Sequence, residues 1–228
     1  MTSADPGRLQ SGSPLATLRR INRDRPTVAP GERCEMCAEP IAEDHQHVVG
    51  LETRSLMCTC RGCYLLFTDQ HASLRYRAVP DRYLSFPGFA FSQADWNDLQ
   101  IPVGLTFLFK NSIQGRVVAF YPSPAGATES ELPLESWDQI VAKNPRLAAL
   151  LPDVEALLIY GADRGLGDFS CHLVPIDACY ELVGTMRKTW RGFDGGQEAR
   201  AAMDGFFSSV EMRSRPAPPV DAEVSEPA

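Results

Sequence analysis

Two pairs of closely spaced cysteines constrain the fold of this chain more than any other feature. Cys34 and Cys37 form one C-x2-C motif, Cys60 and Cys63 form a second, and 22 residues separate the two motifs. Two thiolates with this spacing on a tight turn can both reach one metal ion at about 2.3 Å, and two such turns complete a tetrahedron. The separation is close to that of zinc ribbons, so the sequence predicts that these four cysteines bind one zinc ion.

Three further residues leave the exact ligand set open. Cys58 lies two residues before Cys60, so on an extended strand both side chains point to the same side. Cys58 could therefore replace Cys60 or lie beside the ligands, and we favour Cys60 because it completes the C-x2-C turn. His45 and His47 could displace a cysteine or bind a second ion together with Cys58, since histidine is a common zinc ligand. We interpret them instead as two surface histidines near a turn.

The identity of the metal has one alternative. Four thiolates in a tetrahedral array also bind a single iron ion or an iron–sulfur cluster, and five cysteines lie between residues 34 and 63. Their spacing does not match the cysteine runs of ferredoxins, so zinc is favoured. The sequence shows no secretory signal and no apolar run of about 18 residues, which predicts a cytoplasmic protein without a membrane span. Cytosolic thiols stay reduced, which favours metal ligands over disulfides.

The net charge bears on the class of partner. The chain has a formal charge of −7, so it does not attract phosphate backbones over long range. This argues against nucleic acid as the main partner. Arg75, Arg77 and Arg82 could form a local basic patch, but we interpret them as part of an ordinary solvated strand.

Composition and turn residues divide the chain into four segments. They are a disordered tail at residues 1–30, a zinc-ribbon-like metal-binding unit at 31–70, an α+β domain at 74–212 and a disordered tail at 213–228. The first tail contains one segment, 15–21, that could form a short docking helix. With 44% hydrophobic residues, the middle of the chain can bury a core.

Hydrophobic periodicity predicts the secondary structure of the two middle segments. Hairpins are expected at 47–51 with 56–59, at 104–109 with 116–121, and at 154–160 with 168–174. A single strand is expected at 74–79, and helices at 134–143, 176–190 and 197–210, with a further helix capped by Ser92. Strands in hairpins, with helices between and after them, predict an α+β fold with a mainly antiparallel sheet and flanking helices.

No recognisable catalytic centre is visible in the sequence. It lacks a G-x-S-x-G elbow, a P-loop and a Gly-rich dinucleotide fingerprint. Cys171 and His172 are adjacent, so on a strand they point to opposite faces and cannot pair as nucleophile and base. Cys179 is interpreted as a core residue, and Asp153 and Glu155 as solvated surface. The sequence therefore leaves an enzymatic role open but favours a non-catalytic one.

Two other segments are candidates for binding. Residues 121–130 (YPSPAGATES) follow a strong strand and form a loop of small, rigid residues, which we interpret as a strand-to-helix connection. An enzyme that binds a small ligand at this loop is the weakest of the functional hypotheses. Residues 190–193 (WRGF) combine aromatic and arginine side chains of the kind enriched at protein interfaces.

Several strings in the chain resemble an uncharacterised bacterial family that is named only as a domain of unknown function. The strings are ERCEMC at 32–37, LETR at 51–54, CTCRGC at 58–63, IPVGL at 101–105, YPSPAGATE at 121–129 and WRGF at 190–193. The resemblance covers about residues 31–210. Members of that family look like products of nickel–iron hydrogenase gene clusters. The resemblance implies an accessory role with a hydrogenase subunit or maturation factor as the protein partner, and it brings no catalytic residue.

Overall fold

The computed structural model describes residues 33–69, 74–123, 126–130, 134–161, 169–192 and 195–219. The predicted tail at 1–30, with its helix at 15–21, lies outside these residues, and so does the chain from 220 onward. In the described part of the chain, none of the helices has the length and apolar character needed to cross a membrane.

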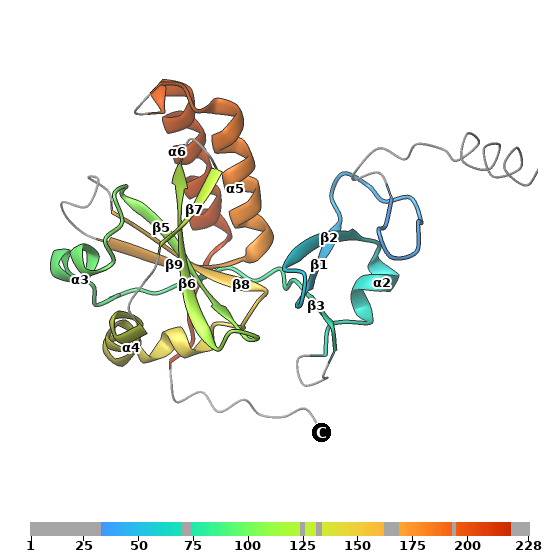
Figure 1. Ribbon diagram of the computed structural model, residues 1–228, viewed down its shortest axis with the longest axis horizontal. Helices are drawn as coiled ribbons and strands as arrows, with labels where there is room; N and C mark the ends of the chain where they lie inside the picture. Colours follow the sequence, from blue (N-terminus) through green and yellow to red (C-terminus); the bar gives the residue numbers. More distant parts are fainter. Residues whose placement is uncertain are drawn as a thin grey trace, which may run out of the picture.

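The larger part of the described fold is a seven-stranded, mainly antiparallel sheet with the strand order β10-β4-β9-β8-β5-β6-β7 (Figure 1). Its strands are β4 (Leu84–Ser85), β5 (Leu105–Asn111), β6 (Arg116–Ser123), β7 (Gly126–Ser130), β8 (Glu155–Gly161), β9 (Phe169–Pro175) and β10 (Arg215–Pro216). Only β10 and β4 pair in parallel. The predicted hairpins β5–β6 and β8–β9 are confirmed, and so is the α+β fold class.

Helices cover both faces of this sheet (Figure 1). They are α3 (Gln93–Asp98), α4 (Leu134–Lys143), the 3-10 helix η1 (Pro145–Ala149), α5 (Ile176–Thr189) and α6 (Gly196–Arg213). The first three pack on one face, while α5 and α6 pack together on the other. The predicted cap of α3 is confirmed, because Ser92 accepts from the Asp95 amide and the Asp95 carboxylate accepts from the Ser92 amide.

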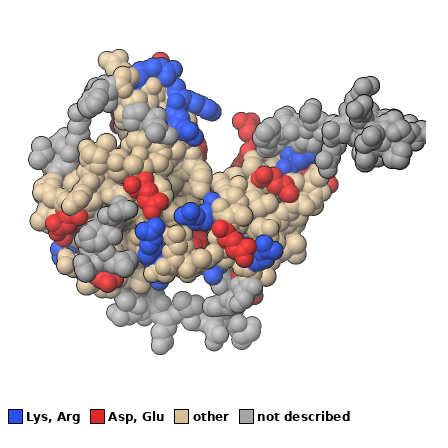
Figure 2. Space-filling view, in the orientation of Figure 1, with Lys and Arg blue, Asp and Glu red and all other residues tan. Residues whose placement is uncertain are grey.

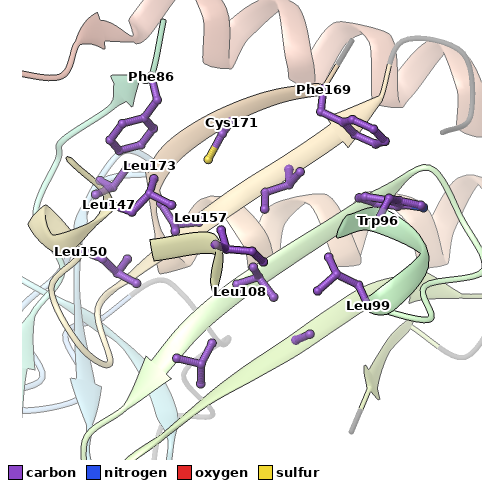
Figure 3. Close-up of a cluster of buried hydrophobic side chains, with 14 of the residues drawn as sticks. Phe86, Trp96, Leu99, Leu108, Leu147, Leu150, Leu157, Phe169, Cys171 and Leu173 are labelled. Atoms are coloured by element: carbon purple, nitrogen blue, oxygen red, sulfur yellow. The ribbon is translucent and has the colours of Figure 1, made fainter. Parts of the chain in front are cut away.

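Two apolar cores follow from the alternation of side chains along the central strands. On β8, Leu157 and Ile159 point towards α3, α4 and η1, whereas Ala156 and Leu158 point towards α5 and α6. Figure 3 shows the first of these cores. Leu157 and Leu158 are fully buried, and the burial of each such side chain contributes about 1.5–3 kcal/mol of transfer free energy.

A second, smaller sheet lies beside the large one and has the strand order β2-β1-β3 (Figure 1). Its elements are β1 (Gln46–Gly50), β2 (Ser55–Thr59), β3 (Tyr76–Ala78) and the short helix α2 (Arg61–Leu65). The predicted hairpin of β1 and β2 is confirmed. The strand predicted at 74–79 is present as β3, and it pairs with β1 rather than with the large sheet. The division of the chain into domains at residues 70–74 stays a prediction.

The two sheets are joined by apolar contacts and by ion pairs that the sequence did not indicate. Val49 and Val79 pack into the core beneath α5 and α6. The guanidinium of Arg82 donates to both carboxylate oxygens of Glu155, at 2.8 and 2.7 Å, and the Glu155 side chain is fully buried. The interpretation of Glu155 as solvated surface is therefore wrong, because its neighbour in space is an arginine 73 residues away in sequence.

The other two arginines of the suggested basic patch also face carboxylates. Arg77 lies 3.5 Å from Asp153, whose side chain is 10% exposed, so Asp153 is not solvated surface either. Arg75 pairs with Glu52 on the surface. Figure 2 shows acidic and basic side chains interspersed across the middle of the displayed face. Because each arginine is matched by an acid, the three do not form a basic patch.

The segment after α6 corrects the predicted boundary of the C-terminal tail. Residues 213–228 were expected to be disordered, but Arg215 and Pro216 form β10 beside β4. The amide of Arg215 donates to the Tyr83 carbonyl, the amide of Ala217 donates to the Ser85 carbonyl, and Ala217 is buried. The composition of the segment did not reveal these backbone partners, which lie about 130 residues earlier.

We predict that the pair between Arg82 and Glu155 stabilises the fold measurably. Arg82→Met leaves a buried carboxylate without its cation, which costs about 3–5 kcal/mol in fully buried pairs. The Arg82 side chain is 37% exposed, so we expect a smaller loss of about 2–3 kcal/mol in the free energy of unfolding. Arg75→Met is the matched control, because its pair is exposed and should be worth less than about 1 kcal/mol. Equal losses in urea denaturation of the two variants would contradict this prediction.

Candidate metal centre

The first cysteine pair lies on a tight turn that precedes the small sheet. The amide of Cys34 donates to the Glu39 carbonyl and the amide of Ala38 donates to the Cys34 carbonyl, both at 2.8 Å. Ala38 adopts a left-handed conformation with φ of 64°, which reverses the chain direction after Cys37. These bonds fix the positions of both thiols relative to the backbone.

The second pair lies where β2 ends and α2 begins. Cys60 is the N-cap of α2, and its carbonyl accepts from the Tyr64 amide at 3.0 Å. Its sulfur accepts from the amide of Cys63 at 3.5 Å. A sulfur that accepts an N–H bond from the next cysteine of the motif is held in an orientation that suits a thiolate. The local sequence C-x2-C thus builds its own turn.

Glu35 joins the two turns. Its amide donates to the Cys58 carbonyl at 2.9 Å, and its carboxylate accepts from the Cys58 amide at 2.6 Å. Because of these bonds, the first turn lies against the end of β2, next to the second turn. The small sheet therefore brings together two cysteine pairs that are 22 residues apart in sequence.

The four predicted ligands converge. The sulfur atoms of Cys34, Cys37, Cys60 and Cys63 all lie within 4.8 Å of one another. The sulfurs of Cys37 and Cys60 lie 3.6 Å apart. A disulfide needs about 2.05 Å between sulfurs, whereas a tetrahedral zinc–thiolate site places them about 3.8 Å apart. The arrangement can therefore hold a metal ion, and it matches a tetrahedron better than a cross-link.

The electrostatics of the cluster favour a bound cation. Burial opposes ionisation of the Cys34 thiol, but backbone amides of Cys60, Cys37 and Met36 donate to its sulfur and bring its pKa down to about 6. In contrast, the hydrogen bond with Cys37, burial and the other thiols raise the pKa of Cys63 to about 12. One thiolate forms readily and hinders ionisation of the next, and a positive ion among the four sulfurs would relieve this repulsion.

The remaining candidate ligands lie in a separate group. One ring nitrogen of His45, one of His47 and the Cys58 sulfur lie within 4.8 Å of one another, and none of the three belongs to the four-cysteine group. Cys60, and not Cys58, belongs to the group with Cys34, Cys37 and Cys63. The interpretation of His45 and His47 as ordinary surface histidines does not hold, because both rings are partly buried and their centroids are 4.8 Å apart.

Cys179 is a core residue, as the sequence indicated, and Cys171 is buried in a core as well. Cys171 and Cys179 are 3% and 2% exposed and belong to different apolar cores. Burial raises the pKa of both thiols, which keeps them protonated and unreactive. His172 points away from Cys171 and contacts the Ser214 hydroxyl at 2.9 Å.

The segments proposed for binding differ from expectation. Residues 121–130 are not a strand-to-helix connection, because they contain the end of β6 and the whole of β7, which pair with each other. Trp190 is half-buried and packs against the α5–α6 core, while Arg191 is exposed. β7 does contribute Ala127 and Glu129 to a cavity of about 430 Å³ between the small sheet, the large sheet and α5. Sequence periodicity could not reveal this cavity, because its walls come from segments far apart in the chain.

We predict that loss of one thiol removes the metal and destabilises the small sheet. Cys63→Ser leaves three ligands, and metal binding contributes about 10–16 kcal/mol to folding in zinc-finger peptides. The metal content per chain and the melting temperature of Cys63→Ser should both fall. A strong chelator should lower the melting temperature of the wild type by the same amount and change that of the variant little. Cys171→Ala, in the apolar core, is the control that should retain the metal. Unchanged metal content in Cys63→Ser would contradict the assignment.

Comparison with known proteins identifies the family but no characterised relative. No curated protein and no solved structure matches the chain significantly. The model of the family of unknown function DUF5947 matches residues 33–214, which include all four clustered cysteines and every strand of both sheets except β10. This match covers most of the chain and agrees with the resemblance to an uncharacterised family. The protein therefore belongs to the DUF5947 family.

Proposed function

We propose that the protein is a non-catalytic accessory or adaptor protein whose zinc-ribbon-like unit is stabilised by a structural zinc ion bound to Cys34, Cys37, Cys60 and Cys63. The convergence of four sulfurs within 4.8 Å carries this proposal. Four protein ligands fill a tetrahedron and leave no position for a substrate, which is typical of structural zinc sites rather than catalytic ones.

The small sheet needs such an ion for physical reasons. Its fully buried residues, such as Val48 and Thr59, are few, and much of its remaining apolar surface is used against the large domain. A unit with so little core of its own gains stability from a metal that ties its two turns together. The zinc ion then fixes the orientation of the small sheet, which the chain can present to a partner.

A nickel–iron hydrogenase subunit or maturation factor is the partner that we propose, and the cytoplasm is the compartment. The hydrogenase link rests on the family resemblance described above, and the compartment rests on the reduced thiols that a zinc site requires.

The partner is tested by purification of the tagged full-length chain from native cells, followed by mass spectrometry of the co-purifying proteins. We expect enrichment of a hydrogenase subunit or maturation protein with the wild type and with Cys171→Ala. Enrichment should fall at least tenfold with Cys63→Ser, because that variant loses the proposed zinc. Absence of every hydrogenase-related protein from the wild-type sample would refute the partner, but not the zinc site.

The alternative function is a redox protein that carries iron or an iron–sulfur cluster and exchanges electrons with a hydrogenase. Four thiolates could bind iron equally well by geometry. Cys58 is the additional thiol that suggested an iron–sulfur cluster in the sequence. Its sulfur lies near His45 and His47 and not in the four-cysteine group. This separation favours a mononuclear four-thiolate site.

Anaerobic purification separates the two functions. We expect a colourless protein with zinc bound at the four cysteines, no visible absorbance band and no paramagnetic signal after oxidation or reduction. Stoichiometric iron with thiolate-to-iron absorbance would establish the redox alternative and refute structural zinc.

A further inference from the structure

The pairing of β1 with β2 places three potential metal ligands on one face of the small sheet. His47 is directly opposite Cys58 in this antiparallel pair, so their side chains are neighbours. His45 lies two residues before His47, which puts it on the same side of the extended chain. As a result, one ring nitrogen of each histidine and the Cys58 sulfur lie within 4.8 Å of one another.

A contact at Nδ1 holds each of the two histidine rings. The Nδ1 atom of His47 lies 2.9 Å from a carboxylate oxygen of Asp177, and the Nδ1 atom of His45 lies 2.9 Å from the Ala42 carbonyl oxygen. These oxygens only accept hydrogen bonds, so each Nδ1 carries a proton and Nε2 is the ring nitrogen that remains for a metal ion. A histidine that donates Nδ1–H to a carboxylate or carbonyl and offers Nε2 is the usual form of a metal-binding imidazole.

The other nitrogen of His45 supplies an independent observation. Its Nε2 atom is buried and has no hydrogen-bond partner among the described residues. A buried nitrogen without a hydrogen-bond partner is destabilising, and a metal ion bound to it would remove that cost. Two carboxylates add negative charge around the group, since Asp177 contacts His47 and Glu35 accepts from the Cys58 amide.

We propose that His45, His47 and Cys58 form a second transition-metal site, separate from the four-cysteine group, at the junction between the small sheet and the first turn of α5. Two imidazoles and one thiolate suit a divalent, borderline-soft ion such as Zn²⁺ or Co²⁺. Ideal bond lengths place such ligand atoms about 3.3–3.6 Å apart, so a small side-chain movement from the observed positions completes the site.

Three protein ligands leave one corner of a tetrahedron open, unlike the four-cysteine group. Water or a donor atom of another molecule occupies such a corner. Val49 and Leu56, the next pair along the same face of the hairpin, line the cavity of about 430 Å³. The open site and the cavity are therefore neighbours on the surface that faces α5.

Metal stoichiometry of the full-length chain tests this proposal. Protein saturated with Zn²⁺ and then desalted should carry two ions per chain by native mass spectrometry. His47→Ala and Cys58→Ala should each carry one ion per chain. With Co²⁺ in place of Zn²⁺, the charge-transfer absorbance of Cys58→Ala should lack the contribution of one thiolate. His172→Gln and Cys171→Ala are matched controls outside both groups, and they should retain two ions.

Asp177→Asn provides a variant that changes no ligand. Its amide can still contact His47, but it lacks the carboxylate charge that holds the Nδ1 proton. We expect Zn²⁺ affinity at the second site to fall by about 10–100-fold, measured by competition with a chromophoric chelator, while the first ion stays bound.

Three outcomes would overturn the proposal. One is a wild-type chain that never binds more than one Zn²⁺ at saturation. Another is a His47→Ala variant that retains both ions. The third is a folded Cys58→Ala variant, by circular dichroism, that loses the four-cysteine ion instead, which would show that Cys58 belongs to the first site.

Discussion

Repulsion between thiolates is the constraint on which the small sheet depends. Four sulfurs held within 4.8 Å of one another repel one another when they ionise, and the pKa shifts of Cys34 and Cys63 in opposite directions are consistent with this repulsion. The metal ion that we propose would relieve this repulsion and link the two turns. The hairpin between the turns then determines where His47 and Cys58 lie, and its inner face determines how the small sheet packs on α5. The clustering of the sulfurs, the register of the small sheet and its contact with α5 are thus consequences of the same short segment.

Much of the fold could be predicted because its signals are local. The hairpins β5–β6 and β8–β9, helix α4 and the Ser92 cap each depend on residues that are close in sequence, and even the most distant paired residues of these hairpins, Glu155 and Pro175, belong to consecutive strands. Contacts between distant segments had no such signal. Composition alone predicts that Arg215 and Ala217 belong to a disordered tail. The sequence near Glu155 predicts solvated surface, although Glu155 is buried against Arg82. Neither the composition of the C-terminal segment nor the sequence around Glu155 indicates which distant residues these segments contact.

The candidate site shows the same division. The two C-x2-C motifs indicated the four-cysteine group, because each motif builds its own turn. The role of His45, His47 and Cys58 depended on hairpin register. A turn at residues 52–55 was expected, but the turn lies at 51–54, with Gly50 opposite Ser55 and Arg54 in a left-handed conformation. A turn at 52–55 would place His47 opposite Cys60. The actual register places it opposite Cys58, and Asp177, 130 residues away, could not be foreseen as its partner.

X-ray absorption at the zinc edge of the full-length protein tests the central claim most directly. The account predicts zinc in the purified chain with a dominant shell of sulfur at about 2.3 Å, and with any nitrogen contribution lost on substitution of His47. A protein without zinc, or zinc surrounded only by oxygen and nitrogen at about 2.0–2.1 Å, would contradict it.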